Sequence, residues 1–178
     1  ADLAALRLRT PLSPEESFSD DPLRMLRAAR FIAGYGLEPD DALLAAVAAM
    51  GERMEIVSME RVHDELAKLM VVEDPSAGLW FLVDSGLAQL ILPELPRMRV
   101  EQDPIHRHKD VLTHTIAVVA NTDPQLRVRL AALFHDIGKP ATRSFEHGGV
   151  TFRHHEAVGA KLTRGRLREL GFEHQTVK

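Results

Sequence analysis

The sequence predicts an all-α protein that is mainly helical, with one small β-hairpin. Of its 178 residues, 45% are hydrophobic and only 5% are aromatic, and Ala, Leu, Arg and Glu predominate over the β-branched types. The first group of residues favours helices, whereas β-branched and aromatic residues favour strands. Capping residues also precede many of the apolar stretches that have helical spacing. These observations favour packed helices over a sheet protein.

The expected elements follow from caps, apolar spacing and breakers, taken along the chain. The alternation in 6–9 fits the end of a strand or an extended entry segment, and 10–19, with two prolines and three serines, reads as a loop. Asp20-Asp21-Pro22 supplies an acidic cap and then a proline near the first helical position. Helices are expected over residues 22–33, 40–50, 58–70, 76–83, 87–92, 109–121, 124–136 and 155–170. A hairpin around a His-Gly-Gly turn is expected over 143–152, and the proline-rich segment 93–104 reads as a linker or domain boundary.

Composition excludes several functional classes. Without cysteine, the chain has no disulfide framework, no thiolate metal site and no cysteine nucleophile. Its longest apolar runs fall well short of the roughly 20 residues of a membrane-spanning helix, so no membrane partner is expected. Residues 1–100 have a net charge of −7 and residues 101–178 of +3, and eight of the nine histidines lie in the second segment. Histidine binds metals and transfers protons near neutral pH, which makes this segment a candidate site.

A first candidate site lies at the start of the helix expected after Pro22. Asp21 and Arg24 are three residues apart and share its first turn, and Arg27 and Arg30 follow at the same interval. The simpler interpretation is an acidic residue at the helix N-terminus followed by solvated arginines. The chemical alternative is a base-selecting pair. A carboxylate accepts the amino hydrogen of cytosine or adenine and a guanidinium donates to the ring nitrogen, whereas guanine and uracil present a ring N–H there.

The run from Ser19 to Phe31 resembles the "E-D-x-x-R" motif of bacterial CCA-adding tRNA nucleotidyltransferases and poly(A) polymerases. The run from Glu60 to Leu69 resembles the "E-R-x-x-x-E-x-x-K" helix that follows it in that family, although alone it reads as an ordinary amphipathic helix. The resemblance implies that Asp21 and Arg24 contact the base of CTP or ATP and that Arg27 lies near the nucleotide. One departure is Asp20, where the family usually has Glu.

The family's polymerase head carries a glycine-rich phosphate loop and a D-x-D pair for two Mg²⁺ ions. The sequence contains no Asp-x-Asp and no such loop. The chain is therefore expected to be a fragment without the N-terminal head. The expected domains are 1–21, the end of the head and a connecting loop; 22–99, a base-selecting and RNA-binding neck and body; and 100–178, a second helical domain.

A second candidate site comprises His114, His135, Asp136 and His155. His135-Asp136 directly follows the apolar run 130–134, and a charged group at the end of an apolar helix needs a partner, which a metal ion would supply. A lone histidine is more often structural, but imidazoles and a carboxylate together suit Mn, Fe, Ni, Zn or Mg.

This pattern resembles the HD superfamily of metal-dependent phosphohydrolases, with its signature H…HD…H…D. The resemblance implies that His114, His135, Asp136 and His155 are ligands, with His154 as the alternative to His155. It also makes Lys139 a candidate phosphate contact, although a solvated lysine fits equally well. The superfamily's final Asp is expected after Lys178, which would leave the domain incomplete at its C-terminus.

Three functions remain open on this reading. The leading hypothesis is the neck and HD part of a cytoplasmic enzyme that adds CCA to tRNA from CTP and ATP with Mg²⁺. The second is an HD phosphohydrolase that acts on a 2′,3′-cyclic phosphate, a 2′-nucleotide or a phosphomonoester with a divalent metal such as Mn, Ni, Mg or Fe. The third is a module that only holds tRNA.

Overall fold

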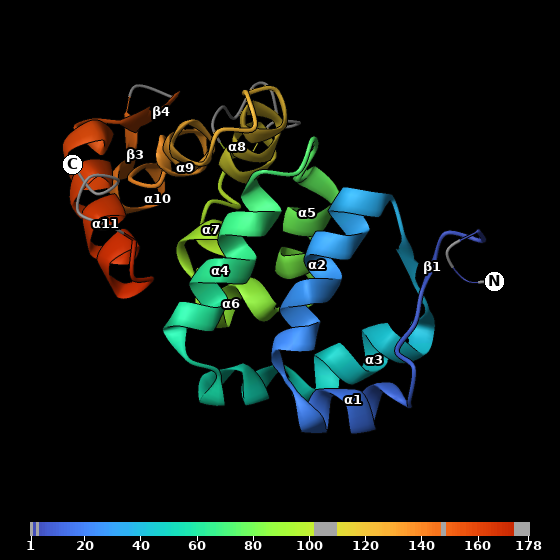
Figure 1. The fold of residues 1–178 in the computed structure, drawn as a ribbon. Helices are drawn as coiled ribbons and strands as arrows, with labels where there is room; N and C mark the ends of the chain where they lie inside the picture. Colours follow the sequence, from blue (N-terminus) through green and yellow to red (C-terminus); the bar gives the residue numbers. More distant parts are fainter. Residues whose placement is uncertain (1, 3, 102–109, 147–148, 173–178) are drawn as a thin grey trace.

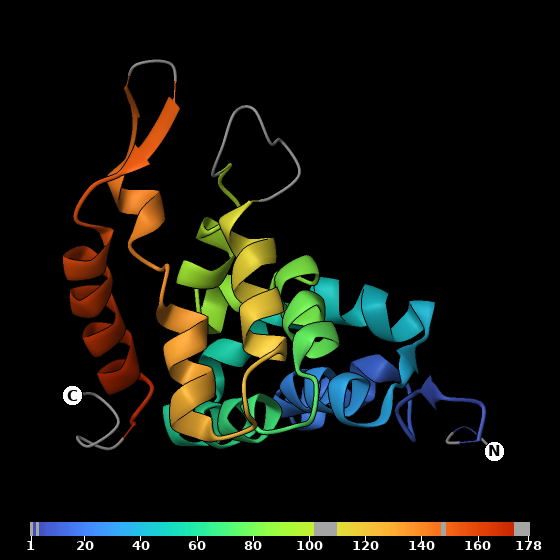
Figure 2. The same ribbon diagram turned by 90° about the horizontal axis from the view of Figure 1, so that it is seen from above.

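The computed structural model describes residues 2, 4–101, 110–146 and 149–172, and it confirms the all-α class with a small hairpin (Figures 1 and 2). The N-terminal part comprises β1 (Arg7–Leu8), α1 (Pro14–Asp20), α2 (Leu23–Tyr35), β2 (Glu38–Pro39), α3 (Asp41–Met50), the 3-10 helix η1 (Gly51–Ile56), α4 (Met59–Met70), α5 (Ser76–Asp84), α6 (Leu87–Ile91) and α7 (Glu94–Arg97). The C-terminal part comprises α8 (Val111–Ala120), α9 (Leu126–Phe134), α10 (Lys139–Thr142), β3 (Arg143–Glu146), β4 (Gly149–Phe152) and α11 (His155–Glu169). Within the described ranges, no helix has both the length and the apolar character to cross a membrane.

Helix α2 packs against both α4 and α5 in the N-terminal part (Figure 1). Its apolar stripe, which includes Met25, Leu26 and Ala29, is buried because α4 and α5 cover it. A Cβ at Gly78 of α5 would lie 2.5 Å from the Ala29 carbonyl oxygen. Glycine at this position therefore allows α5 to approach α2 closely.

The prediction of a loop over residues 10–19 is wrong, because the structure has helix α1 from Pro14 onward. Ser13 caps α1: its hydroxyl accepts from the Glu16 N–H, and the Glu16 carboxylate accepts in return from the Ser13 N–H. Pro14 is at the first helical position, where a missing N–H has no cost. The Ser-x-x-Glu pattern is a capping box, and it outweighs the loop propensity of the surrounding serines and prolines.

The expected helices are otherwise present, with ends shifted by one or two residues. Asp40 caps α3 by accepting from the Leu43 N–H at 2.8 Å, and Gly36 ends α2 in the left-handed conformation, with φ 62°. The strand expected at 6–9 is present as β1, and it pairs in parallel with β2, which the sequence did not predict. The segment expected as a linker contains α7, which packs against α6 and α8.

In the C-terminal part, α8 packs against α9, and α11 packs against α10. The hairpin β3–β4, expected over 143–152, pairs Arg143 with Phe152 and Glu146 with Gly149, and it extends away from the helices (Figure 2). A Cβ at Gly138 would lie 2.1 Å from the His155 carbonyl oxygen. The absence of a side chain at Gly138 thus lets the start of α11 rest on the turn that follows α9.

Polar contacts also join the two parts. The buried guanidinium of Arg129 in α9 donates to the carbonyl of Glu73, just after α4, and to that of Thr122. Near the end of the described chain, the His63 ring of α4 hydrogen-bonds the Leu170 carbonyl. The α11 residue Arg166 forms a two-pronged ion pair with Glu94 of α7. These contacts hold α9 and α11 against the helices of the N-terminal part.

Candidate functional site

The carboxylate of Asp21 lies at the junction of α1 and α2, where it is held from two sides. The Leu23 N–H donates to Oδ1 at 3.2 Å, which ties the carboxylate to the first turn of α2. Arg61 of α4 donates from Nη2 to both carboxylate oxygens, at 3.0 and 2.9 Å. Three of the roughly four lone-pair directions of a carboxylate are thereby used, and the fourth, on Oδ2, accepts no hydrogen bond but has Arg27 Nη1 3.9 Å away as an ion-pair partner. Asp21 is therefore held in place while it retains capacity for one further donor.

Arg24 follows Asp21 by three residues in the sequence, but its side chain contacts other groups than the Asp21 carboxylate does. Its Nη1 donates to the Ser17 carbonyl at 3.1 Å and lies 3.9 Å from the Asp20 carboxylate. Its side chain is 40% exposed and that of Asp21 is 21% exposed, so both remain reachable from solvent. In this structure no ion pair joins Asp21 and Arg24 to each other, and their joint role in base recognition stays a prediction.

The other two arginines of the motif, Arg27 and Arg30, converge on Glu65 of α4. Arg30 Nε donates to Glu65 at 2.8 Å, Arg27 Nε lies 3.4 Å away and Lys68 Nζ 3.6 Å away. Burial by itself would raise the pKa of Glu65, but the hydrogen bond from Arg30 and the charges of Arg30, Lys68 and Arg27 outweigh it and lower the pKa. The carboxylate is thus ionised and holds the arginine row of α2.

Arg61 and Glu65 were noticed in the sequence only as members of a resembling motif, without a role. Helical spacing gives the signal that was missed: positions 61, 65 and 68 lie on one side of α4. What the spacing could not show is that this side faces the Asp21 end of α2.

The four residues of the second candidate site come together around Asp136, and they are called the His/Asp cluster below. One ligand atom each from His114, His135 and Asp136 lies within 4.8 Å of the other two. His135 Nε2 is 3.1 Å and His114 Nε2 is 3.9 Å from Oδ2, and His155 Nε2 is 3.8 Å from Oδ1. A metal ion about 2.1 Å from each ligand would separate the ligand atoms by roughly 3–4 Å. The spacing of His114, His135 and Asp136 therefore fits a divalent ion, whereas His155 lies next to the other carboxylate oxygen, outside this set of three.

Backbone carbonyls orient two of the imidazoles in the cluster. His135 Nδ1 lies 2.7 Å from the Ala132 carbonyl oxygen, and His155 Nδ1 lies 2.8 Å from that of Phe152. A carbonyl can only accept, so each Nδ1 carries the hydrogen and each neutral ring has a bare Nε2. Both Nε2 atoms are directed at Asp136. Acceptors that converge in this way require a cation among them, either a proton or a metal ion.

Asp136 is the charged centre of the cluster and is only 4% exposed. Burial would raise its pKa, but hydrogen bonds from His135 and Lys139 outweigh this and lower the pKa to about 2. The hydrogen bond to Asp136 in turn raises the pKa of His135. Lys139 Nζ lies 2.7 Å from Asp136 Oδ2, so in this structure Lys139 pairs with the cluster. Its predicted contact with a phosphate stays a prediction.

His154, the alternative to His155, lies outside this group. It is the N-cap residue of α11, with a left-handed backbone (φ 61°) and an exposed side chain. Among the described residues, only His114, His135 and Asp136 bring one ligand atom each within 4.8 Å of the others. His155 is the further histidine of the cluster, with Nε2 3.8 Å from Asp136 Oδ1.

Comparison with known proteins matches two segments of the chain to family models. Residues 36–98 match the family model described as a probable RNA and SrmB-binding site of polymerase A, and residues 111–178 match the model of the HD domain. The chain is 36% identical over 185 residues to a CC-adding tRNA nucleotidyltransferase of Thermus thermophilus, which covers 97% of the chain and 42% of the relative.

Two further relatives extend the comparison. The chain is 36% identical to an A-adding tRNA nucleotidyltransferase of Deinococcus radiodurans, over 92% of the chain and 41% of the relative. It is also 36% identical to a multifunctional CCA protein of Ralstonia nicotianae, over 96% of the chain and 40% of the relative. The chain thus spans about two fifths of the length of the relatives it matches. The two family-model matches and these relatives together show that the chain belongs to the HD-domain-containing branch of the bacterial CCA-adding tRNA nucleotidyltransferase and poly(A) polymerase family, which is a family of enzymes.

Proposed function

We propose that this chain is the base-selecting and HD part of a cytoplasmic enzyme that completes the CCA end of tRNA from CTP and ATP. The names of the relatives support this, since they add CC, add A or are multifunctional CCA proteins. The observation that carries the proposal is the state of Asp21. Arg61 and the Leu23 N–H hold its carboxylate, and one acceptor direction of Oδ2 makes no hydrogen bond, with Arg27 Nη1 3.9 Å away.

Asp21 and Arg24 would divide base recognition between them. Asp21 accepts from the amino group that cytosine and adenine share, and Arg24 donates to the neighbouring ring nitrogen. Guanine or uracil would set a ring N–H against the guanidinium and leave a donor unpaired, at a cost of roughly 1–3 kcal/mol. Nucleotidyl transfer itself depends on two Mg²⁺ ions, for which this chain has no D-x-D pair. The role of this part is therefore to choose the nucleotide and to hold tRNA.

The test is nucleotide choice by the full-length protein on tRNA that lacks its CCA end. Asp21→Ala and Arg24→Ala should each reduce the preference for CTP and ATP over GTP and UTP by roughly tenfold or more, because each removes one charged hydrogen bond. Glu60→Ala, an exposed carboxylate on α4, is the control and should leave the preference unchanged. Unchanged preference in both test variants would make Asp21 only a helix cap.

A second function is favoured by the His/Asp cluster. We infer that it binds a divalent metal ion and hydrolyses a phosphate ester, with 2′,3′-cyclic phosphates, 2′-nucleotides and phosphomonoesters as candidate substrates. A bound ion would polarise the ester and lower the pKa of a coordinated water. The protein's own part is to keep His135 and His155 in the Nε2-bare tautomer and to place the ionised Asp136 between them. Lys139, beside Asp136, is positioned to carry positive charge towards a phosphate.

The hydrolase is tested with 2′,3′-cyclic AMP as substrate and with Mn²⁺, Ni²⁺, Mg²⁺ or Fe²⁺ added in turn to metal-free protein. Hydrolysis that depends on the metal and disappears in Asp136→Asn would support it. Activity that survives in Asp136→Asn would locate the reaction elsewhere.

A further inference from the structure

The outward side of α11 carries a row of exposed positive side chains, called the α11 basic face below. Lys161, Arg164 and Arg168 are three and four residues apart, so they share one side of the helix and extend over ~10 Å of its axis. All three side chains are exposed. Among the described residues, no carboxylate lies within ion-pair distance of any of them.

The other side of α11 is the one that packs on the rest of the protein. Gly159 and Leu167 are its buried residues, and the cation on that side, Arg166, pairs with Glu94 and Glu169. Figure 2 shows α11 at the outer flank of the C-terminal part, with the other helices on one side of it only. The fold therefore satisfies the inward arginine and leaves the basic face to solvent.

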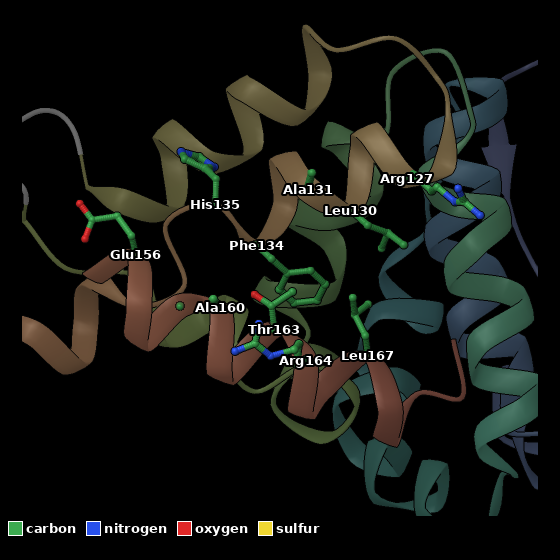
Figure 3. A pocket seen from close by; sticks show the side chains of 11 residues that line it. Arg127, Leu130, Ala131, Phe134, His135, Glu156, Ala160, Thr163, Arg164 and Leu167 are labelled. Carbon is green, nitrogen blue, oxygen red and sulfur yellow. The ribbon is translucent and has the colours of Figure 1, made fainter. Parts of the chain in front are cut away.

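A groove of about 340 Å³ between α9 and α11 borders the basic face (Figure 3). Its lining includes the apolar side chains of Leu130 and Phe134. Arg164 lies at its edge, whereas Lys161 and Arg168 do not line it. The basic face is therefore a surface separate from the groove.

The row of like charges does not serve the helix that bears it. Like charges three or four residues apart repel each other and weaken a helix. Residues 1–100 have a net charge of −7, so the basic face is not part of a general excess of positive charge. The face fits a partner with closely repeated negative charges. Double-stranded DNA presents roughly one such charge per 1.7 Å of axis, and an RNA duplex has the same charged backbone.

We propose that the α11 basic face binds the phosphate backbone of tRNA. The proposal rests on the proposed role of this chain in completing tRNA. It adds a contact outside residues 36–98, the segment that matches the model of a probable RNA-binding site. Side chains cannot read bases in the deep major groove of an RNA duplex, so the row contacts phosphates rather than a sequence. The contact should therefore be the same for every tRNA and should weaken as salt is added.

Equilibrium binding of tRNA that lacks its CCA end tests the basic face. Fluorescein-labelled tRNA is titrated with the full-length protein in EDTA, at several KCl concentrations, and followed by anisotropy. Lys161→Gln/Arg168→Gln removes two charges with little change in helix propensity and does not alter the groove. It should weaken binding at least tenfold. It should also lower the slope of log affinity against log salt by roughly 1.4–1.8, the share of two phosphate contacts. Adding Arg164→Gln should weaken binding further.

The matched control removes the same charge from another part of the chain. Arg7→Gln/Arg9→Gln alters two exposed arginines at β1, on the opposite side of the molecule from α11 (Figure 1). It should change tRNA affinity less than twofold. Thermal melts of each variant confirm that the fold is intact. Equal losses of affinity in the two double variants would overturn the proposal, because they would reflect net charge alone.

Failure of the proposed function and failure of the basic face give different results. In nucleotide addition, Lys161→Gln/Arg168→Gln should raise KM for tRNA at least tenfold and leave kcat and the preference for CTP over UTP within twofold of the parent. If the parent adds no nucleotide, the proposed function is wrong, but a loss of tRNA binding in this variant alone still supports the basic face. Equal tRNA affinity in parent and variant would overturn the proposal whatever the activity. Binding of only the parent to phosphatidylglycerol vesicles would then assign the face to a membrane surface.

Discussion

Arg61 Nη2 donates to both carboxylate oxygens of Asp21, at 3.0 and 2.9 Å, across forty residues of sequence. The contact joins the two motifs that the sequence shows separately, one at the start of α2 and the other on α4. It also restricts Asp21 to one orientation. A carboxylate held in this way loses little further freedom when it accepts a hydrogen bond from a base, which strengthens discrimination between bases.

Arg61→Ala in the full-length protein should weaken the preference for the correct base, because it frees the Asp21 carboxylate and not because Arg61 contacts the nucleotide. We expect the preference for CTP over UTP to fall roughly threefold to tenfold, since a partly exposed ion pair contributes about 1 kcal/mol. Incorporation of each nucleotide into tRNA lacking its CCA end measures this. Arg61→Lys should recover part of the preference, because the ammonium can still reach Asp21. An unaltered preference in Arg61→Ala would mean that Asp21 needs no such support.

Glu65→Gln should destabilise the N-terminal part by about 1–3 kcal/mol at pH 7, because it leaves the arginine row of α2 without its buried counter-charge. The pKa of Glu65 is lowered in the folded protein, so its contribution is full above the ordinary value of 4.5 and is lost as the pH falls through the lowered value. The difference from the parent protein should therefore shrink below pH 4.5. Urea unfolding at pH 7 and pH 4 measures it.

The control for Glu65→Gln is Glu60→Gln, because Glu60 is an exposed carboxylate on the same helix. It should change the free energy of unfolding by less than about 0.5 kcal/mol, which is usual for a surface site. A Glu65→Gln protein as stable as the parent at pH 7 would show that the row of arginines is adequately solvated without Glu65.

The affinity for metal should differ between the variants His155→Ala and His154→Ala, which alter two neighbouring histidines. The ring of His155 is directed at Asp136, whereas His154 is an exposed N-cap, so only His155→Ala should weaken Mn²⁺ binding, by roughly tenfold or more. Titration of metal-free protein with Mn²⁺ by calorimetry measures this. Equal affinity in both variants would remove His155 from the site.

The same titration should depend on pH in a defined direction. The pKa of His135 is raised by Asp136, so a proton stays on the imidazole to a higher pH and competes with the metal. Affinity should therefore begin to fall at a pH above 6.5, the ordinary value for histidine, as the pH is lowered. Asp136 stays ionised throughout this range because its pKa is about 2. Affinity that is flat between pH 8 and pH 6 would contradict the assignment of His135 as a ligand.

Gly138→Ala should displace the start of α11 and, with it, His155. The added methyl would lie 2.1 Å from the His155 carbonyl oxygen and 2.7 Å from the Gly159 nitrogen, which are backbone atoms that cannot move aside alone. We expect a loss of about 1–3 kcal/mol in stability and weaker Mn²⁺ binding. Gly165→Ala, within α11 and with open space around it, should be neutral or stabilising by up to about 1 kcal/mol. Similar melting curves for the two variants would show that α11 is not anchored at Gly138.

Local patterns in the sequence were enough for the fold class, for the hairpin and for most helices, because caps, stripes and turn residues act over a few positions. Ser13 and Glu16 show the limit of that reasoning: the capping box was present, but the serines and prolines around it were read as a loop. Strand β2 could not be predicted, since two residues become a strand only when β1 lies beside them.

The sequence by itself determined which residue types were available for chemistry, namely an Asp/Arg turn and a set of histidines after an apolar helix. Only the tertiary structure decided what those residues meet. Arg61 reaches Asp21 because α4 packs along α2, and His155 reaches Asp136 because Gly138 lets α11 start against the end of α9. The groove between α9 and α11 likewise exists only once both helices are packed. The physical reason is that spacing along a helix sets which side chains share a face, whereas close packing of whole helices sets which faces meet.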